Sequence, residues 1–181
     1  EISGDITANT TWSSNNKYVL KGFVYVKSPA VLTIEPGTII RGDKATKGTL
    51  IIERGAQIFA VGTQNSPIVF TSNEEKGNRS YGDWGGIILL GNAPTNRSTT
   101  PIIEGGVNAV YGGSIANDNS GILRYVRIEF AGIAADPNSE INGLTLGGVG
   151  NGTVIENVQV SYGNDDAYEF FGGNVNCKNL I

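Results

Sequence analysis

The sequence predicts an all-β chain that folds as a solenoid of stacked coils, and three observations support this. A strand-like phrase at residues 123–130 (LRYVRIEF) returns at 155–162 (IENVQVSY) and begins again at 177–181 (CKNLI). Glycine, with 26 residues, and asparagine are used heavily, and both tolerate the positive φ angles of tight turns. Apolar residues at helical spacing are missing, whereas β-branched and aromatic residues alternate throughout. A repeated unit that cannot bury its apolar face alone is typical of a solenoid.

The alternation within the repeated phrase predicts which side chains face the core. Apolar residues recur at every second position, so one set points inward and the other outward. The inward set is expected to form three columns along the solenoid: Val126, Val158 and Leu180; Ile128 and Val160; Phe130 and Tyr162. Cys177 aligns with the apolar Leu123 and Ile155, so we expect a buried and unreactive thiol.

Two further columns are polar. Tyr125, Asn157 and Asn179 share one corner position, where stacked asparagine side chains can hydrogen-bond to one another and to the turn backbone. We expect these three residues to form a structural ladder. The residues before them form an outward column of alternating charge: Arg124, Glu156 and Lys178. Such a column favours one register between coils.

Composition argues against several classes of function. The chain of 181 residues is long enough for one domain, and its net charge of −4 with 13 scattered basic residues argues against a nucleic-acid partner. The sequence has no apolar run long enough to cross a membrane. Histidine is absent, which removes Ser-His-Asp and Cys-His triads, histidine-ligated zinc and imidazole acid–base chemistry. A single cysteine excludes an internal disulfide framework.

The chain divides into a polar N-terminal segment and a repetitive remainder. Residues 1–17 are expected to cap the first coil, because an uncovered sheet edge recruits other chains, and residues 18–181 are expected to form the coils. At roughly 20 to 25 residues per coil, the sequence predicts about seven or eight coils. The chain has no methionine and ends within a strand phrase. We therefore expect a trimmed product without its targeting segment, whose coils continue beyond Ile181.

Longer motifs carry a resemblance to a known family. Four segments occur in this order: 32–42 (LTIEPGTIIRG), 50–63 (LIIERGAQIFAVGT), 66–72 (SPIVFTS) and 82–94 (GDWGGIILLGNAP). Together with the corner asparagines, they resemble the secreted and cell-surface right-handed parallel β-helix proteins of Bacteroidota, which have a pectin-lyase-like fold. This resemblance extends over residues 18–181. It implies a right-handed parallel β-helix, and a location outside the cell or on its outer surface.

Acidic side chains are the strongest candidates for chemistry. Asp165, Asp166 and Glu169 lie in one glycine-bounded stretch, and Asp136 and Glu140 lie in the preceding loop. An offset of 25 residues, which aligns the Gly-Gly pairs beginning at 147 and 172, would place Glu140 over Asp165. Two carboxylates one strand spacing apart repel unless a cation, a shared proton or hydration relieves them. Three interpretations stay open: hydrated loops, a Ca²⁺ site formed by Asp136, Glu140, Asp165 and Asp166, and a catalytic pair.

The catalytic interpretation is supported by a motif. Asn138-Ser139-Glu140 and Asp165-Asp166 resemble, in order and spacing, the Asn-Thr-Asp and Asp-Asp motifs of polygalacturonases. This resemblance would make Glu140, Asp165 and Asp166 the carboxylates of a polysaccharide-cleaving enzyme. The Gly-His-Gly and Arg-x-Lys motifs of that family are absent from the chain. A lyase-like elimination is a further alternative, since this fold can pair calcium with a basic residue.

Aromatic side chains offer a non-catalytic alternative. Trp84, Tyr81 and Tyr168 are candidates for stacking on sugar rings if they are exposed. Our leading expectation is a non-catalytic module of an exported surface protein, which acts as a structural or adhesive scaffold and binds glycan. The alternatives are a polysaccharide-cleaving enzyme and a subunit of a larger extracellular assembly. Calcium is the one cofactor that the sequence suggests.

Overall fold

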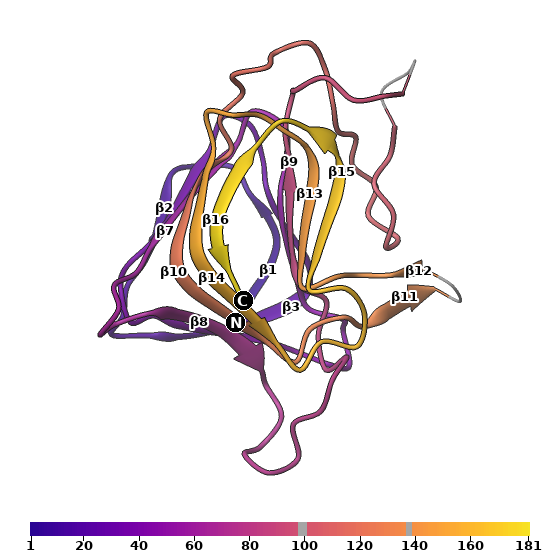
Figure 1. The fold of residues 1–181 in the computed structure, drawn as a ribbon. Coiled ribbons are helices and arrows are strands. Elements are labelled where there is room, and N and C mark those ends of the chain that lie inside the picture. Colours follow the sequence, from indigo (N-terminus) through magenta and orange to yellow (C-terminus); the bar gives the residue numbers. More distant parts are fainter. Residues whose placement is uncertain (98–100, 137–138) are drawn as a thin grey trace.

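Every regular element in the described part of the chain is a β-strand. The computed structural model describes residues 1–97, 101–136 and 139–181, without the side chain of Asp136. The long strands pair in parallel and wind as a right-handed β-helix, which Figure 1 shows along its axis. The prediction of an all-β parallel solenoid is therefore confirmed. Within these residues no helix is long and apolar enough to cross a membrane.

Each coil of the β-helix contributes to three faces. Face A consists of β1 (Ile2–Ile6), the second half of β3 (Lys17–Val26), β6 (Thr49–Ile52), β9 (Ile87–Leu90), β13 (Leu144–Val149) and β15 (Tyr168–Gly173). Face B consists of β2 (Thr10–Trp12), β4 (Val31–Ile34), β7 (Gln57–Val61), the first halves of β10 (Gly121–Glu129) and β14 (Val154–Ser161), and β16 (Asn176–Leu180). Face C consists of the first half of β3, β5 (Ile39–Gly42), β8 (Ile68–Ser72) and the second halves of β10 and β14.

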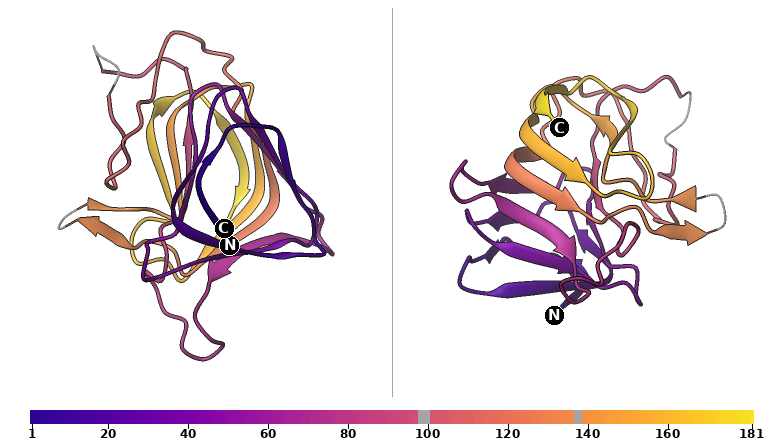
Figure 2. Two further views of the ribbon diagram at one scale, coloured as in Figure 1. Left: turned by 180° about the vertical axis from the view of Figure 1, so that it is seen from behind. Right: turned by 60° about the horizontal axis from the view of Figure 1, so that its bottom comes forward.

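In the described residues these strands stack as six coils, so the expected seven or eight was wrong. The difference lies in two long insertions that leave the coil. Residues 91–120 connect β9 to β10, and residues 130–143 contain an antiparallel hairpin of β11 (Ala134–Asp136) and β12 (Ser139–Glu140). Figure 1 shows this hairpin projecting away from the coils, and Figure 2 shows the two termini at opposite ends of the stack.

The N-terminal segment takes part in the first coil. Of residues 1–17, β1 pairs in parallel with β3 and β2 with β4, so the segment continues the stacking of the later coils. Trp12, at the end of β2, is buried and stacks on Tyr18 with ring centroids 5.0 Å apart. A role as a protective cap stays a prediction.

The core lies inside the coils and follows the repeated phrase. Val126 pairs with Val158 and Val158 with Leu180, as the alternation predicted. The expected inward column of Phe130 and Tyr162 was wrong for Tyr162, whereas Phe130 is half-buried and packs against the core. Both residues have positive φ (63° and 58°) at a corner, where their rings stack 5.0 Å apart and Tyr162 is 70% exposed. The chain turns at these positions, so the strand alternation does not extend to Tyr162.

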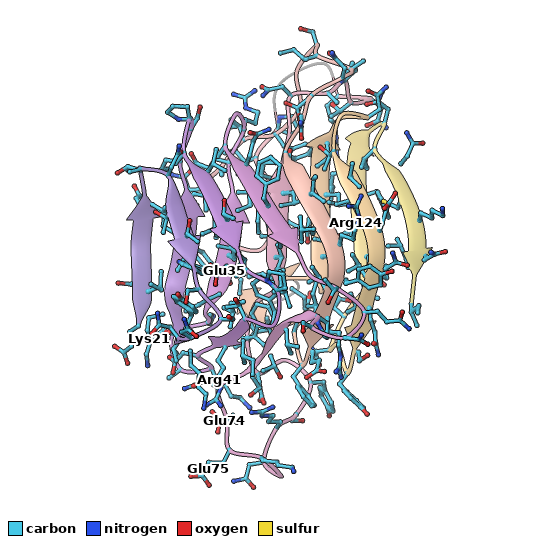
Figure 3. All side chains as sticks on the ribbon, turned by 90° about the vertical axis from the view of Figure 1, so that its left-hand side faces the viewer. Lys21, Glu35, Arg41, Glu74, Glu75 and Arg124 are labelled. Atoms are coloured by element: carbon cyan, nitrogen blue, oxygen red, sulfur yellow. The ribbon has the colours of Figure 1, made fainter. Side chains whose placement is uncertain are left out.

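The corner between faces B and C repeats one backbone conformation in three coils. Tyr125, Asn157 and Asn179 have φ of 50°, 54° and 55° and occupy equivalent positions between paired strands. Asn179 Nδ2 donates to Asn157 Oδ1 over 2.9 Å. Asparagine tolerates this left-handed conformation better than most residues. Beside this corner Arg124 pairs with Glu156 at 3.1 Å on the outer side of face B, where Figure 3 shows the strands side by side.

Candidate functional site

The β9–β10 insertion (residues 91–120) covers the outer side of face A. From Ile103 to Tyr111 every second residue is buried, so one side of this segment packs against the sheet. The segment folds back on itself through hydrogen bonds from Ile103 N to Ala109 O and from Tyr111 N to Pro101 O, both 3.0 Å. Its buried side chains form a second apolar cluster with outward residues of the sheet: Ile51, Ile88, Leu90, Ile103, Val107, Ala109, Tyr111 and Ile141.

Several hydrogen bonds hold this insertion to the rest of the molecule, and one of them runs from the Gly173 N–H of β15 to Pro94 O over 3.0 Å. The Gly105 N–H donates to Ser139 Oγ in the β11–β12 hairpin over 3.0 Å. Arg54, in the turn after β6, donates from Nη1 to Gly112 O over 2.8 Å. The insertion is therefore hydrogen-bonded to β15, to the β11–β12 hairpin and to the turn after β6.

Glu169 lies at the end of an outward column on face A. The paired positions run through Tyr25, Ile51, Ile88 and Thr145 to Glu169. Ile51, Ile88 and Thr145 are buried beneath the insertion, so the Glu169 carboxyl lies at the edge of an apolar, covered surface. Such a surface disfavours the charged form of a carboxyl.

Glu169 meets a second carboxyl there. Glu104, from the insertion, shares a hydrogen bond with it, and Asn142 Nδ2 donates to its Oε2. Burial, followed by Glu104, Asp166 and Asp165, raises the pKa of Glu169 to about 7. Two carboxyl groups can hydrogen-bond to each other only if one of them carries a proton. The pair therefore holds a proton up to near-neutral pH.

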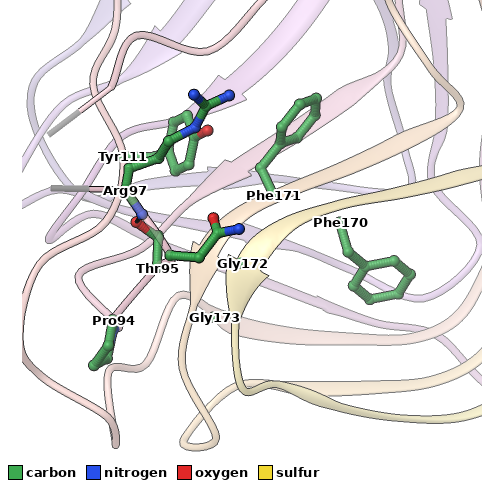
Figure 4. Close-up of a pocket in the computed structure, with 9 residues that line it drawn as sticks. Pro94, Thr95, Arg97, Tyr111, Phe170, Phe171, Gly172 and Gly173 are labelled. Carbon is green, nitrogen blue, oxygen red and sulfur yellow. Dashed lines mark hydrogen bonds between the residues drawn. The ribbon is translucent and has the colours of Figure 1, made fainter. Parts of the chain in front are cut away.

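A groove lies beside this pair, between the insertion and the end of β15. Its volume is about 540 Å³. The side chains that line it include Thr95, Asn96, Arg97, Tyr111, Phe170 and Phe171. Tyr111 and Phe171 are in aromatic contact with ring centroids 5.9 Å apart. Figure 4 shows Arg97 on the same side of β15 as these two rings, and Phe170 on the opposite side. Aromatic rings beside a guanidinium and an amide suit a polar ligand with apolar faces, such as a sugar.

The acidic residues that the sequence suggested as one site lie on different elements. Asp165 and Asp166 are exposed in the loop before β15, whereas Glu140 lies in β12 and pairs with β11. In the coils Leu144 pairs with Tyr168 and Gly147 with Phe171, so the expected alignment was wrong by one residue. Because the hairpin leaves the coil before β13 begins, Glu140 and Asp165 are not on paired strand positions.

The structure does not test the predicted calcium site. Within the described side chains, no three acidic, histidine or cysteine residues could hold a metal ion together. The predicted set includes Asp136, whose side chain lies outside the described residues, as does Asn138 of the polygalacturonase-like motif. The calcium site of Asp136, Glu140, Asp165 and Asp166 stays a prediction.

The three predicted glycan-stacking residues differ in exposure. Trp84 is fully buried, packs on Phe70 and donates from Nε1 to Glu129 O over 2.7 Å, so it offers no ring face to a ligand and that prediction was wrong. Tyr168 is half-buried, and its hydroxyl donates to the Val158 carbonyl over 2.7 Å. Tyr81 is 64% exposed in the loop between β8 and β9.

Glu104 is the site residue that the sequence did not reveal. It lies in an insertion without counterpart in other coils, so no repeat aligns it with Glu169. The one available signal was the apolar alternation from Ile103 to Tyr111, which predicts a segment packed on a surface. That pattern does not identify the surface.

Comparison with protein families gives one match. A family model described as pectate-lyase like beta helix domain matches residues 4–181. Comparisons with curated proteins and with solved structures gave no match.

Proposed function

Because the chain belongs to the pectate-lyase-like β-helix family, we propose that it is a non-catalytic module of an exported surface protein that binds a polysaccharide. This family fits a role connected with polysaccharides. The observation that carries the proposal is the groove between the β9–β10 insertion and β15, hereafter the β15 groove. It combines aromatic rings with hydrogen-bonding groups on a rigid sheet.

The lining of the β15 groove matches the chemistry of a sugar ring. Phe171, which is half-buried, offers apolar surface for the C–H face of a sugar, whereas Tyr111 is 4% exposed and packs against the Phe171 ring. Burial raises the pKa of Tyr111, so its hydroxyl remains a donor at neutral pH. Arg97 supplies several N–H donors in a fixed plane for hydroxyl or carboxylate oxygens.

Binding to a panel of neutral and acidic polysaccharides, measured by affinity electrophoresis and calorimetry, tests the proposal. We expect Arg97→Ala and Phe171→Ala to weaken binding by tenfold or more, about 1.4 kcal/mol each. Tyr162→Ala, which removes an exposed aromatic ring elsewhere, is the matched control and should bind as the wild type does. If Tyr81→Ala abolishes binding while the groove variants bind normally, the ligand lies on the β8–β9 loop and the proposal fails.

Polysaccharide cleavage is a second candidate, favoured by the Glu104–Glu169 pair. A protonated carboxyl next to a charged one is the arrangement that supplies a general acid and a base. Release of new reducing ends by the wild type, lost in Glu169→Gln, would establish it. If cleavage is lost in Asp166→Asn instead, the catalytic carboxylates are the ones that the sequence suggested: Glu140, Asp165 and Asp166. If no polysaccharide in the panel is cleaved, binding without cleavage remains the proposed function.

Under this proposal the protein functions outside the cell or on its outer surface. Fractionation of source cells with an antibody to the chain tests the location, and recovery from the cytoplasm would contradict it. Light scattering tests the assembly alternative, since a monodisperse monomer would exclude a homo-oligomer.

A further inference from the structure

We propose that Arg41 and Arg79 form a binding site for a tetrahedral oxyanion, a sulfate or phosphate group, on the outer side of face C. The β15 groove lies on face A, so this site is separate from it and does not rest on the proposed function. Sulfate and phosphate occur both as free ions and as ester groups on polysaccharides, and the test distinguishes these two sources.

Thr71 brings the two arginines together. It lies in β8 and pairs with Arg41 of β5, so the two side chains are neighbours on the outer side of the sheet, from which Figure 3 shows Arg41 projecting. Arg79, in the β8–β9 loop, donates from Nη1 to Thr71 Oγ1 over 3.4 Å. Thr71 is 3% exposed although it points outward, so the surrounding side chains cover it. Both arginines are therefore adjacent to one covered hydroxyl group.

Neither arginine has a carboxylate partner among the described side chains. Arg41 and Arg79 are half-buried, and the ion pairs of the described residues include neither of them. Other cationic side chains do form such pairs: Lys21, Lys27, Lys44, Arg124 and Arg127. A charge that is partly removed from water is costly unless a counter-charge compensates it. Two adjacent guanidinium groups without one are suited to hold an anion.

Arg41 also carries an unsatisfied donor. Its Nε is buried and has no hydrogen-bond partner among the described residues. Native structures leave few buried N–H groups unpaired, and each such group calls for an explanation. Because protein atoms cover Nε, the two Nη groups are the donors that remain for a ligand. An anion held by them would compensate the charge of the whole guanidinium group.

The carboxylate next to Thr71 is already engaged. Glu129 Oε2 accepts a hydrogen bond from Thr71 Oγ1 over 3.1 Å. The other oxygen, Oε1, lies 2.6 Å from Arg127 Nη2. Glu129 is therefore balanced by Arg127, and its charge is not available to the two unpaired arginines.

Glu74, at the start of the β8–β9 loop, is the second acidic residue of this surface. Its backbone oxygen accepts a hydrogen bond from Arg79 Nε over 3.1 Å, and its carboxylate acts on Lys44. Even with Glu74 included, the cluster has three cations and two carboxylates, an excess of one positive charge: Arg41, Arg79, Arg127, Glu74 and Glu129. This excess stands out in a chain whose net charge is −4.

Two arginines suit a tetrahedral oxyanion better than a carboxylate. Each guanidinium group presents parallel N–H donors in one plane, and this fork matches a pair of anion oxygens. One fork satisfies the two oxygens of a carboxylate. Arg41 and Arg79 supply two forks from different elements, β5 and the β8–β9 loop. Sulfate and phosphate, whose oxygens point in several directions, can use both.

Titration with sodium sulfate and sodium phosphate, at an ionic strength held constant with sodium chloride, tests the site. Affinity is measured by calorimetry, and NMR of the arginine side chains should show the Arg41 and Arg79 signals shifting to saturation. Arg41→Gln and Arg79→Gln should each weaken sulfate binding tenfold or more, because the charge and the fork are lost. Arg124→Gln, which removes an arginine already paired with Glu156, is the matched control and should bind sulfate as the wild type does.

Sodium acetate should bind at least tenfold more weakly than sulfate. Wild-type affinity in both Arg41→Gln and Arg79→Gln would overturn the site, and so would an equal loss of affinity in Arg124→Gln. Acetate that binds as tightly as sulfate would overturn the assignment of a tetrahedral anion.

Competition with dextran sulfate and with dextran distinguishes the two sources of the group. If dextran sulfate displaces inorganic sulfate from Arg41 and Arg79 and dextran does not, the site accepts a sulfate ester. If inorganic sulfate binds and dextran sulfate does not compete, the ligand is the free ion. Arg97→Ala, which tests the β15 groove, should leave sulfate binding unchanged. Sulfate binding without any polysaccharide in the groove would therefore reject the proposed function alone, and the reverse result would reject this site alone.

Discussion

Lys44 Nζ lies 2.9 Å from Oδ1 of Asp83, a carboxylate whose side chain has no exposed surface. The other oxygen of Asp83 accepts hydrogen bonds from Ser72 Oγ at 2.7 Å and from the Ser80 N–H at 2.8 Å. Burial disfavours the charge, but the bonds from Ser80, Lys44 and Ser72 outweigh burial and hold the pKa of Asp83 below its usual range. This carboxylate fastens the end of β8, the β8–β9 loop and the turn after β5 to one another.

Asp83→Ala should therefore destabilise the protein by about 3–5 kcal/mol, because it leaves several buried polar groups without a partner. Lys44→Ala should cost about 1 kcal/mol or less, because the lysine side chain is 52% exposed and water replaces part of the interaction. Urea unfolding of both variants at pH 7 measures the difference. Equal costs for the two substitutions would contradict the role assigned to the buried carboxylate.

Gly42 is expected to be intolerant of a side chain. A Cβ at this position, at the end of β5, would lie 2.3 Å from Cβ of Trp84. Gly42→Ala must displace the buried indole and should cost about 1–3 kcal/mol. Thermal unfolding followed by tryptophan fluorescence measures this cost. Gly163→Ala, in an exposed loop, is the control and should shift the melting temperature less; a larger shift there would refute the steric argument.

Two substitutions of a corner asparagine distinguish the cost of backbone strain from the cost of losing the ladder hydrogen bond. Asn157→Gly keeps a residue that tolerates φ of 54° and loses the hydrogen bond from Asn179, so it should cost about 1 kcal/mol. Asn157→Ala also loses this bond and adds the strain of a left-handed conformation, so it should cost about 2 kcal/mol. Chemical denaturation of both variants measures the two losses of stability. If alanine is tolerated as well as glycine, the positive φ does not constrain this position.

The carboxyl pair predicts an unusual pH dependence of stability. The pKa of Glu169 is raised from 4.5 to about 7, so the folded protein keeps a proton that the unfolded chain has already lost. The free energy of unfolding should therefore fall as the pH rises from 4.5 to 7. Melting temperatures across this range should decrease in the wild type and change less in Glu169→Gln. A wild-type melting temperature that rises over this range, with the same slope in the variant, would argue against the shared proton.

The stacked parts of the fold could be predicted because each coil repeats the constraint of the one before. Val126 and Val158 fall in register since an inward column must remain apolar in every coil, and Asn157 and Asn179 recur because the same corner needs the same φ. Glu104 could not be predicted, because an insertion that occurs once has no neighbour to align with. Trp84 looked like a surface ring, and its burial depends on space over Gly42, which a single sequence does not reveal.

The position of the β9–β10 insertion has a consequence for diversification. Faces A and B are joined by residues 27–30, 53–56 and 150–153 in three other coils, whereas residues 91–120 occupy the equivalent corner here. The strands on both sides keep their parallel register with the coils above and below. A different loop at the same corner would therefore give a new recognition surface without changing the strand register, provided that it again covers the outward apolar side chains of face A, Ile51, Ile88 and Leu90.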